Sequence, residues 1–244
     1  MNSKTNSTQS TVNRTSQEPL AGTVKFYQQH LAVCTGGPPE LWAARVEEME
    51  GLFAALSQAL KARGLNKLIK LAACDAPSTG AEGFDIFLMP DMLVLPEITL
   101  DKVEKLANAL EKQFQEGLPF DVRPMAGGDH LFVCTHTNRD ERCGVWGKAF
   151  YDALQQEIER QNAIAYVHQI SHVGGHKYAA NCLIYPSGIW YGNLRPEDAP
   201  RLVAEHLNNE RLLPNHYRGR MGTTVSQQVA EAEAARVLLG SDCD

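Results

Sequence analysis

The segments His30-Leu-Ala-Val-Cys-Thr35 and His130-Leu-Phe-Val-Cys-Thr135 are two copies of one motif, identical at five of their six positions. Each is a short apolar run typical of a buried β-strand, followed by a turn-prone stretch and then by residues in a helical pattern. Chance is a poor explanation for such a match, so the chain contains an internal repeat.

The repeat extends through further elements in each copy. We expect helices over 40–63 and 144–161, strands over 67–73 and 163–170, hairpin turns at Pro90-Asp91 and Pro186-Ser-Gly188, and second helices over 99–114 and 196–207. Both copies read βαβ, then a β-hairpin, then α, which is the element order of the thioredoxin-like fold. The sequence therefore predicts an α/β protein with two tandem thioredoxin-like domains and a C-terminal helical appendage.

Composition sets the expected boundaries of these domains. Residues 1–20 are mostly Ser, Thr, Asn and Gln and cannot form a core, so we expect a disordered tail there. A Ser-rich, acid-poor transit peptide is the alternative. The two thioredoxin-like domains are expected over 21–118 and 129–209, separated by a Gly- and Pro-rich linker. Residues 210–244 form the appendage, with a helix over 225–239.

Charge and cysteine content exclude several classes of protein. The net charge of −6 and the lack of a long basic run disfavour nucleic-acid binding. No apolar stretch reaches the roughly 18 residues of a membrane span, and the N-terminus lacks the apolar region of a secretory signal. We therefore expect a cytoplasmic protein without a membrane partner, whose cysteines serve in metal or redox chemistry.

Four residues of the second copy together make a candidate metal site. Cys134 and Cys143 are spaced C-x8-C, and His172 and His176 are spaced H-x3-H around two glycines. In a thioredoxin-like fold the loops that carry them lie at the same end of the domain. Two thiolates and two imidazoles make a four-ligand set. Spacing alone favours zinc and an iron-sulfur centre about equally.

Longer motifs in the same region resemble a known family. They are Phe132-Val-Cys-Thr-His136, Arg139-Asp-Glu-Arg-Cys143-Gly144, Ser171-His-Val-Gly-Gly-His176, Ala180-Asn181 and Tyr185-Pro-Ser-Gly-Ile-Trp-Tyr-Gly192. The chain from about residue 130 to residue 207 closely resembles the sucrase/ferredoxin-like family of thioredoxin-fold proteins. Tyr217-Arg-Gly-Arg220 resembles the C-terminal segment of that family.

The resemblance implies one [2Fe-2S] cluster, with Cys134 and Cys143 on one iron and His172 and His176 on the other. Other polar residues of the motifs become candidates for contacts around the cluster or with a partner. They are His136, Arg139, Arg142, Lys177 and Asn181.

The first copy departs from the ligand pattern that the resemblance implies. Cys34 matches the first ligand and Cys74 the third, but Ser78 stands at the fourth position and no cysteine matches the second. We therefore expect residues 21–118 to be a degenerate thioredoxin-like domain and 129–209 to be the cluster-binding domain.

Together these features predict an iron-sulfur protein for electron transfer or redox sensing, which exchanges electrons with an unidentified redox partner protein. A substrate-turning enzyme is disfavoured because the chain supplies no second cofactor motif. A zinc-stabilised thioredoxin-like interaction module is the alternative. A metal-free thioredoxin-like oxidoreductase would need a reactive cysteine pair, and no C-x-x-C motif is present.

Histidine ligation predicts a reduction potential that depends on pH. A histidine bound through one nitrogen keeps a second nitrogen that can hold a proton, and an added electron favours that proton. The potential should fall by about 59 mV per pH unit where one proton accompanies one electron. Redox titration of the wild type and of a His172→Cys, His176→Cys double variant measures this slope. A wild-type curve as flat as that of the double variant would contradict histidine ligation.

Overall fold

The computed structural model describes residues 20–112 and 117–241. The expected tail therefore lies outside the described residues, except for Leu20, and so do residues 113–116 near the end of the first expected domain. All structural statements below concern the described ranges.

The first half of the chain forms a βαβ unit, a hairpin and a helix. Its elements are β1 (Gln29–Cys34), α1 (Leu52–Ala62), β2 (Ile69–Cys74), β3 (Phe84–Met89), β4 (Leu93–Ile98) and α2 (Val103–Glu111). β1 runs parallel to β2 and antiparallel to β3, and β3 pairs antiparallel with β4. The parallel pair needs a long crossover connection, which the segment with α1 provides.

The second half repeats this arrangement. Its elements are β6 (Asp129–Cys134), α3 (Lys148–Gln161), β7 (Ala165–Ile170), β8 (Cys182–Tyr185), β9 (Ile189–Tyr191) and α4 (Ala199–Arg201), which continues as a π-helical segment to Leu207. β6 runs parallel to β7 and antiparallel to β8, and β8 pairs antiparallel with β9. The structure therefore confirms the predicted α/β class and the predicted order of elements in both copies.

One sheet of ten strands contains both halves, in the order β10-β9-β8-β6-β7-β2-β1-β3-β4-β5. The halves meet where β2 and β7 run antiparallel, with Cys74 opposite Ile170. The edge strand β5 (Arg123–Pro124) lies in the segment predicted as a linker and pairs with β4. Because the halves share one sheet, the domain boundaries drawn from composition remain a prediction.

The first helix is shorter than the sequence predicts. The segment expected as one helix over 40–63 contains two 3-10 turns, Pro39–Leu41 and Val46–Glu48, and α1 begins only after Gly51. Val46 and Met49 keep the apolar spacing of a helix because they pack on the same core as α1. Apolar periodicity alone therefore could not reveal the interruption.

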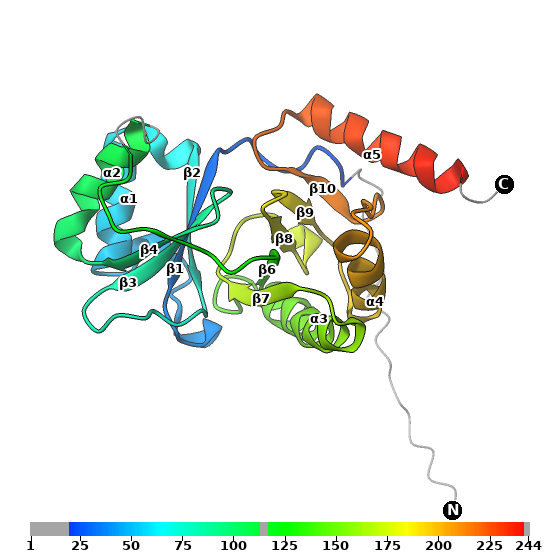
Figure 1. The fold of residues 1–244 in the computed structure, drawn as a ribbon, viewed down its shortest axis with the longest axis horizontal. Helices are drawn as coiled ribbons and strands as arrows, with labels where there is room; N and C mark the ends of the chain where they lie inside the picture. The colour runs from blue at the N-terminus through cyan, green and yellow to red at the C-terminus, as the bar shows by residue number, and fades with distance from the viewer. Residues whose placement is uncertain (1–19, 113–116, 242–244) are drawn as a thin grey trace, which may run out of the picture.

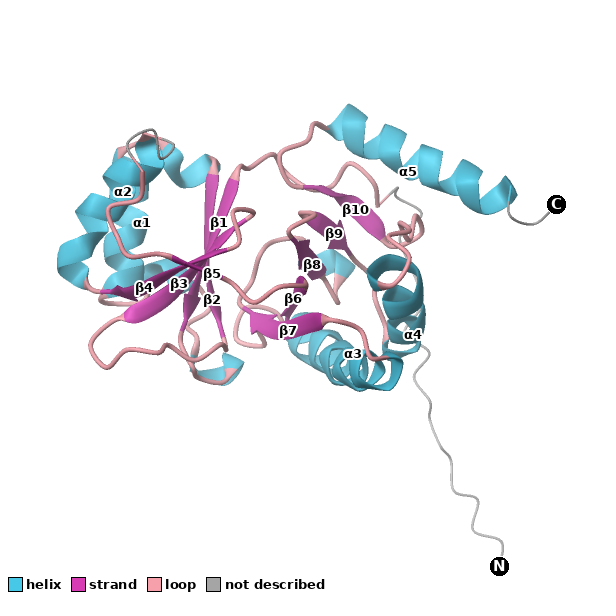
Figure 2. Cartoon of the chain, in the orientation of Figure 1, coloured by secondary structure: helices cyan, strands magenta, loops and turns pink. Residues whose placement is uncertain are grey.

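Three apolar clusters form the core. One lies between the first half of the sheet and the helices α1 and α2, and a second lies between the other half and α3 and α4. The third cluster draws on both halves and includes Ala32, Cys74, Phe132, Cys134 and Trp190. Figures 1 and 2 show α1 and α2 at one end of the molecule and α3 and α4 at the other, with the strands between them. The sheet faces without helices therefore bury each other.

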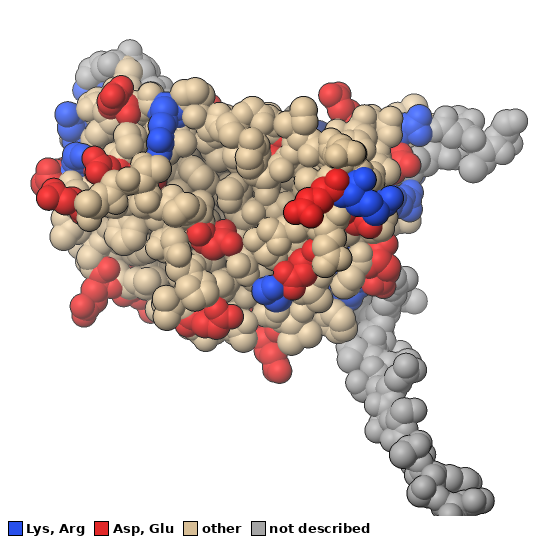
Figure 3. Space-filling view, turned by 60° about the horizontal axis from the view of Figure 1, so that its bottom comes forward, with Lys and Arg blue, Asp and Glu red and all other residues tan. Residues whose placement is uncertain are grey.

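The C-terminal segment adds β10 (Tyr217–Arg220) and α5 (Val225–Ser241) to the second half. β10 pairs antiparallel with β9, and Glu231 of α5 accepts hydrogen bonds from Tyr217 and Arg220. On the face drawn in Figure 3, acidic and basic side chains are scattered and form no extended basic surface. Within 20–112 and 117–241, no helix has the length and apolar character needed to cross a membrane.

The third cluster, to which both halves contribute, is the shared core, and Phe132 allows its contribution to stability to be measured. Its buried ring on β6 packs against Phe87 and His168, at centroid distances of 6.3 and 4.9 Å. We expect Phe132→Ala to lower the free energy of unfolding by about 3–5 kcal/mol, because it removes a large buried ring. Urea unfolding followed by circular dichroism measures this change.

Phe26→Ala is the matched control, since the Phe26 side chain is 48% exposed. It should change the unfolding free energy by no more than about 0.5 kcal/mol. Equal small effects of both substitutions would show that the shared core contributes little to stability.

Candidate metal centre

Three side chains of the second half converge at one end of its strands. Cys134 is the last residue of β6, Cys143 is the first residue of a π-helical turn (Cys143–Gly147), and His172 lies just after β7. One ligand atom from each of these side chains lies within 4.8 Å of the others. Among the described residues this is the only such group of His, Cys, Asp or Glu side chains.

The two thiols of this group shift each other's pKa in opposite directions. Both are buried, and a single hydrogen-bonding contact links them. That contact lowers the pKa of Cys134 well below its ordinary value, and the same contact raises the pKa of Cys143. The lowered pKa of Cys134 favours the thiolate, which is the form of cysteine that binds a metal.

His172 completes the group with a free ring nitrogen. Its Nδ1 atom is buried and has no hydrogen-bond partner. Burying a polar atom without a partner costs free energy, so the unpaired Nδ1 atom of this ring needs an explanation. A bound metal supplies one, because sulfur and imidazole donors suit zinc and iron-sulfur centres. The residues present therefore fit such a group.

His176 lies near the three convergent side chains but not among them. Its ring centroid is 5.5 Å from that of His172, and its Nδ1 atom is 3.5 Å from a carboxylate oxygen of Asp140. The His176 side chain is 46% exposed, so this edge of the candidate site faces solvent. The structure thus brings together three of the four predicted ligands and leaves the ligand role of His176 as a prediction.

The two glycines between these histidines allow the chain to form a tight loop. Gly174 and Gly175 have φ values of +102° and +77°, which other residues rarely adopt. A Cβ atom on Gly175 would also lie 2.5 Å from the guanidinium of Arg218. As the sequence predicts, the segment is a loop and not a continuous helix.

His136 links the site to the first half of the chain. Its Nδ1 atom accepts a hydrogen bond from the backbone N–H of His172 at 3.1 Å, and its Nε2–H donates to the carbonyl of Trp42 at 3.3 Å. Burial lowers the pKa of His136, which favours the neutral ring that both bonds require. Asn138 donates to the same Trp42 carbonyl at 2.9 Å. The loop after β1 therefore holds the loop after β6.

Two of the other predicted contact residues are tied to the site through hydrogen bonds. Asn181 donates to the carbonyl of Gly175 at 3.0 Å and accepts from Arg218 at 2.8 Å. Arg142 pairs with Asp140 at 2.9 Å, and its hydrogen bond lowers the pKa of Asp140 to about 2. The anionic Asp140 in turn lies beside His176.

Arg139 and Lys177 are exposed on the rim of the site. The Lys177 ammonium lies 4.9 Å from the centre of the Tyr178 ring. The sequence did not indicate a site role for Asp140, Trp42, Lys70 or Arg218, although Asp140 and Arg218 lie within the motifs quoted above. A lysine inside the apolar run Leu68-Ile-Lys-Leu71 was the available signal for Lys70.

The first half keeps only part of the corresponding arrangement. Cys34 and Cys74 end β1 and β2, both are fully buried, and their Sγ atoms are 3.8 Å apart. Burial is the main cause of the strongly raised pKa of Cys74. The Ser78 hydroxyl donates to the carbonyl of Cys34 at 2.6 Å, so it holds the loop in place.

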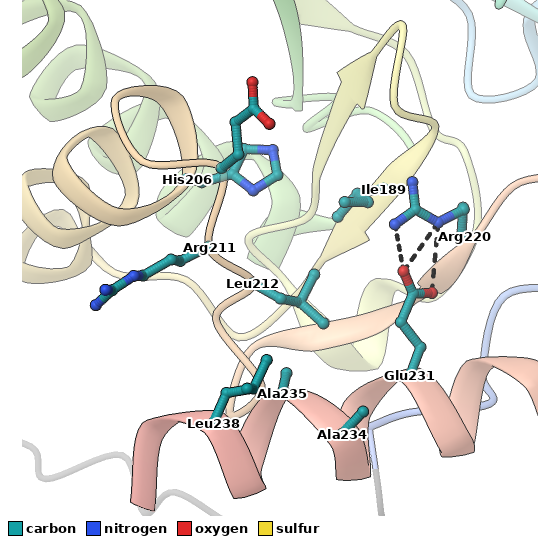
Figure 4. A pocket seen from close by; sticks show the side chains of 10 residues that line it. Ile189, His206, Arg211, Leu212, Arg220, Glu231, Ala234, Ala235 and Leu238 are labelled. Atoms are coloured by element: carbon teal, nitrogen blue, oxygen red, sulfur yellow. Dashed lines mark hydrogen bonds and ion pairs between the residues drawn. The ribbon is translucent and has the colours of Figure 1, made fainter. Parts of the chain in front are cut away.

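A pocket of about 450 Å³ lies elsewhere, between α5, β10 and the segment after α4 (Figure 4). The ion pair of Arg220 and Glu231 forms part of its wall, together with His206 and small apolar side chains. None of the convergent ligand side chains lines it. The pocket is therefore separate from the candidate metal centre.

Comparisons with known proteins give one matching family and several similar proteins. The sequence profile of a family described as sucrase/ferredoxin-like matches residues 20–219. The chain is 26% identical over 237 residues to altered inheritance of mitochondria protein 32 of Debaryomyces hansenii. That alignment covers 84% of this chain and 86% of the other protein. It is 31% identical over 149 residues to actin patches distal protein 1 of Saccharomyces cerevisiae, covering 50% of this chain and 46% of that protein.

Among solved structures, a thioredoxin-like [2Fe-2S] ferredoxin from Aquifex aeolicus is similar at 18% sequence identity. The TM-score is 0.35, and the similarity covers 39% of this chain and 100% of that chain.

The incomplete ligand set of the first half leads to a test. We expect a Cys34→Ser, Cys74→Ser double variant to keep the metal content of the wild type, because two thiols without further ligands cannot hold a centre alone. Elemental analysis and the visible spectrum of the purified protein measure this. Loss of half or more of the metal from a folded double variant would instead require a ligand role for the first half.

Proposed function

The chain belongs to the sucrase/ferredoxin-like family, and from that premise we propose that it binds one [2Fe-2S] cluster for electron transfer or redox sensing. Cys134 and Cys143 would bind one iron, and His172 and His176 the other. The observation that carries the proposal is the convergence of two buried thiols and the imidazole of His172, whose Nδ1 atom has no hydrogen-bond partner.

The bound cluster would supply reversible uptake of a single electron. The protein contributes the charge of the ligands: each neutral imidazole in place of a thiolate removes one negative charge, so an added electron costs less. Proton uptake at a histidine ligand, expected from the sequence, is part of this proposal.

The surroundings of the site support exchange with a partner protein. The exposed edge at His176, with Arg139 and Lys177 on the rim, gives an approach that does not require the core to open. The other ligands are buried or partly buried, which protects a centre from solvent. We therefore propose that a redox partner docks at this rim. A cytoplasmic location belongs to the same proposal, and the five cysteines of the described ranges are all free thiols.

A zinc-stabilised interaction module is the second candidate. The observation that favours it is the short distance among the ligand atoms of Cys134, Cys143 and His172, all within 4.8 Å of one another, which suits a single ion. Exposed His176 would then be a surface residue bonded to Asp140. Colour separates the two candidates, because zinc proteins are colourless and iron-sulfur proteins are not.

The proposal predicts about two irons and two acid-labile sulfides per chain after anaerobic purification. Cys134→Ser and Cys143→Ser should each abolish or strongly reduce the iron content and the visible absorption, because each removes a thiolate ligand. Iron, sulfide and zinc analysis of the same samples measures this.

Cys182→Ser is the matched control, since Cys182 is fully buried on β8 and lies outside the convergent group. It should retain iron and sulfide in its folded fraction. Stoichiometric zinc without iron in the wild type would overturn the proposal in favour of the zinc module.

A further inference from the structure

Two cations contact the loop that carries His172 and His176. Lys70 of β2 donates from its ammonium to the carbonyl of Val173 at 3.3 Å. Arg218 of β10 points its guanidinium at the next carbonyl, that of Gly174, at 3.5 Å. One cation thus comes from each half of the chain, and both contact the loop between the two histidines.

Arg218 is held firmly in the interior. It is only 3% exposed, and it donates to the side chain of Asn181 at 2.8 Å and to the side chain and carbonyl of Thr23 at 3.1 and 3.3 Å. These acceptors are all neutral. They satisfy the N–H groups of the guanidinium without neutralising its charge.

Aromatic rings fill much of the space around both cations. Trp190 has its ring centroid 5.4 Å from the Arg218 guanidinium and 5.5 Å from the Lys70 ammonium. Tyr178 lies 4.7 Å from Arg218, and Tyr27 lies 5.0 Å from Lys70. The faces of such rings attract cations, but they carry no formal charge.

Across the described residues, no carboxylate forms an ion pair with Lys70 or Arg218. Glu47 lines the same pocket as Lys70 and His172 but makes no ion pair with the lysine. Burying charge without a counter-charge is costly. Burial lowers the pKa of Arg218 to about 10, whereas Tyr178, Cys134 and Tyr27 act in the opposite direction. Among the groups that favour the charged form of Arg218, Cys134 belongs to the candidate metal centre.

We propose that Lys70 and Arg218 are fixed counter-charges that favour the reduced state of the metal centre, an inference that rests on the cluster proposed above. Two ferric ions, two sulfides and two thiolates sum to zero charge, so one electron taken up from an external reductant makes the centre negative. Electron uptake itself breaks no bond, and the proton proposed to accompany it would bind a nitrogen of a histidine ligand. Positive charges held beside the centre stabilise the product and raise the reduction potential. Neither residue binds the centre, and both act on it only through their electrostatic field.

The test is the reduction potential of Arg218→Met and Lys70→Met, which remove each charge while keeping much of the side-chain volume. We expect each substitution to lower the equilibrium constant for one-electron reduction about tenfold. This corresponds to a fall of about 59 mV in the reduction potential. Arg218→Lys keeps the charge and should stay close to the wild type. Arg160→Met is the control, because Arg160 is exposed at the far end of α3 and pairs with Glu157.

Iron and sulfide analysis of every sample separates the possible outcomes. A wild type without iron and sulfide would overturn the proposed function, and the counter-charge role with it. Variants that keep the cluster at an unchanged potential would overturn the counter-charge role alone. If Arg218→Met fails to fold, Lys70→Met decides between these results. Loss of the cluster from both Met variants and from Arg218→Lys would show that these side chains serve loop structure, and would also overturn the role.

Discussion

The hydrogen bonds between Ser171 and Ala73 join the two halves of the sheet at the point where the candidate site begins. The backbone N–H of Ser171 donates to the carbonyl of Ala73 at 2.8 Å, and the backbone N–H of Ala73 donates to the Ser171 hydroxyl at 2.9 Å. The next residue is His172. The junction of β7 with β2 therefore fixes the backbone just before His172. The first half of the chain thus helps to determine where this predicted ligand of the second half lies.

The repeat made the fold predictable, because one motif found twice restricts both copies to the same order of strands and helices. The convergence of Cys134, Cys143 and His172 followed from the same reasoning, since loops after parallel strands lie at one end of a sheet. The contributions from distant segments could not be predicted in this way. Lys70 lies a hundred residues before the loop that it contacts, and only the packing of the two halves brings it there.

The first half lacks counterparts of two of the predicted ligands but contributes structural contacts. The loop after β1, where a ligand is missing, presents the carbonyl of Trp42 to His136 and Asn138. This segment, which corresponds in the repeat to the loop after β6, thus supports that loop of the other copy. Cys34 and Cys74 remain as small buried side chains in the shared core, which is how free cysteines commonly behave.

The two edges of the sheet also limit how the molecule assembles with itself. At one edge, β5 is only two residues long and contains Pro124, which has no N–H to offer another strand. At the other edge, Glu231 fastens α5 beside β10 (Figure 1). A long open sheet would invite further strands from other copies and grow into fibrils. Here the proline and the fastened helix make the sheet a poor template for such aggregation.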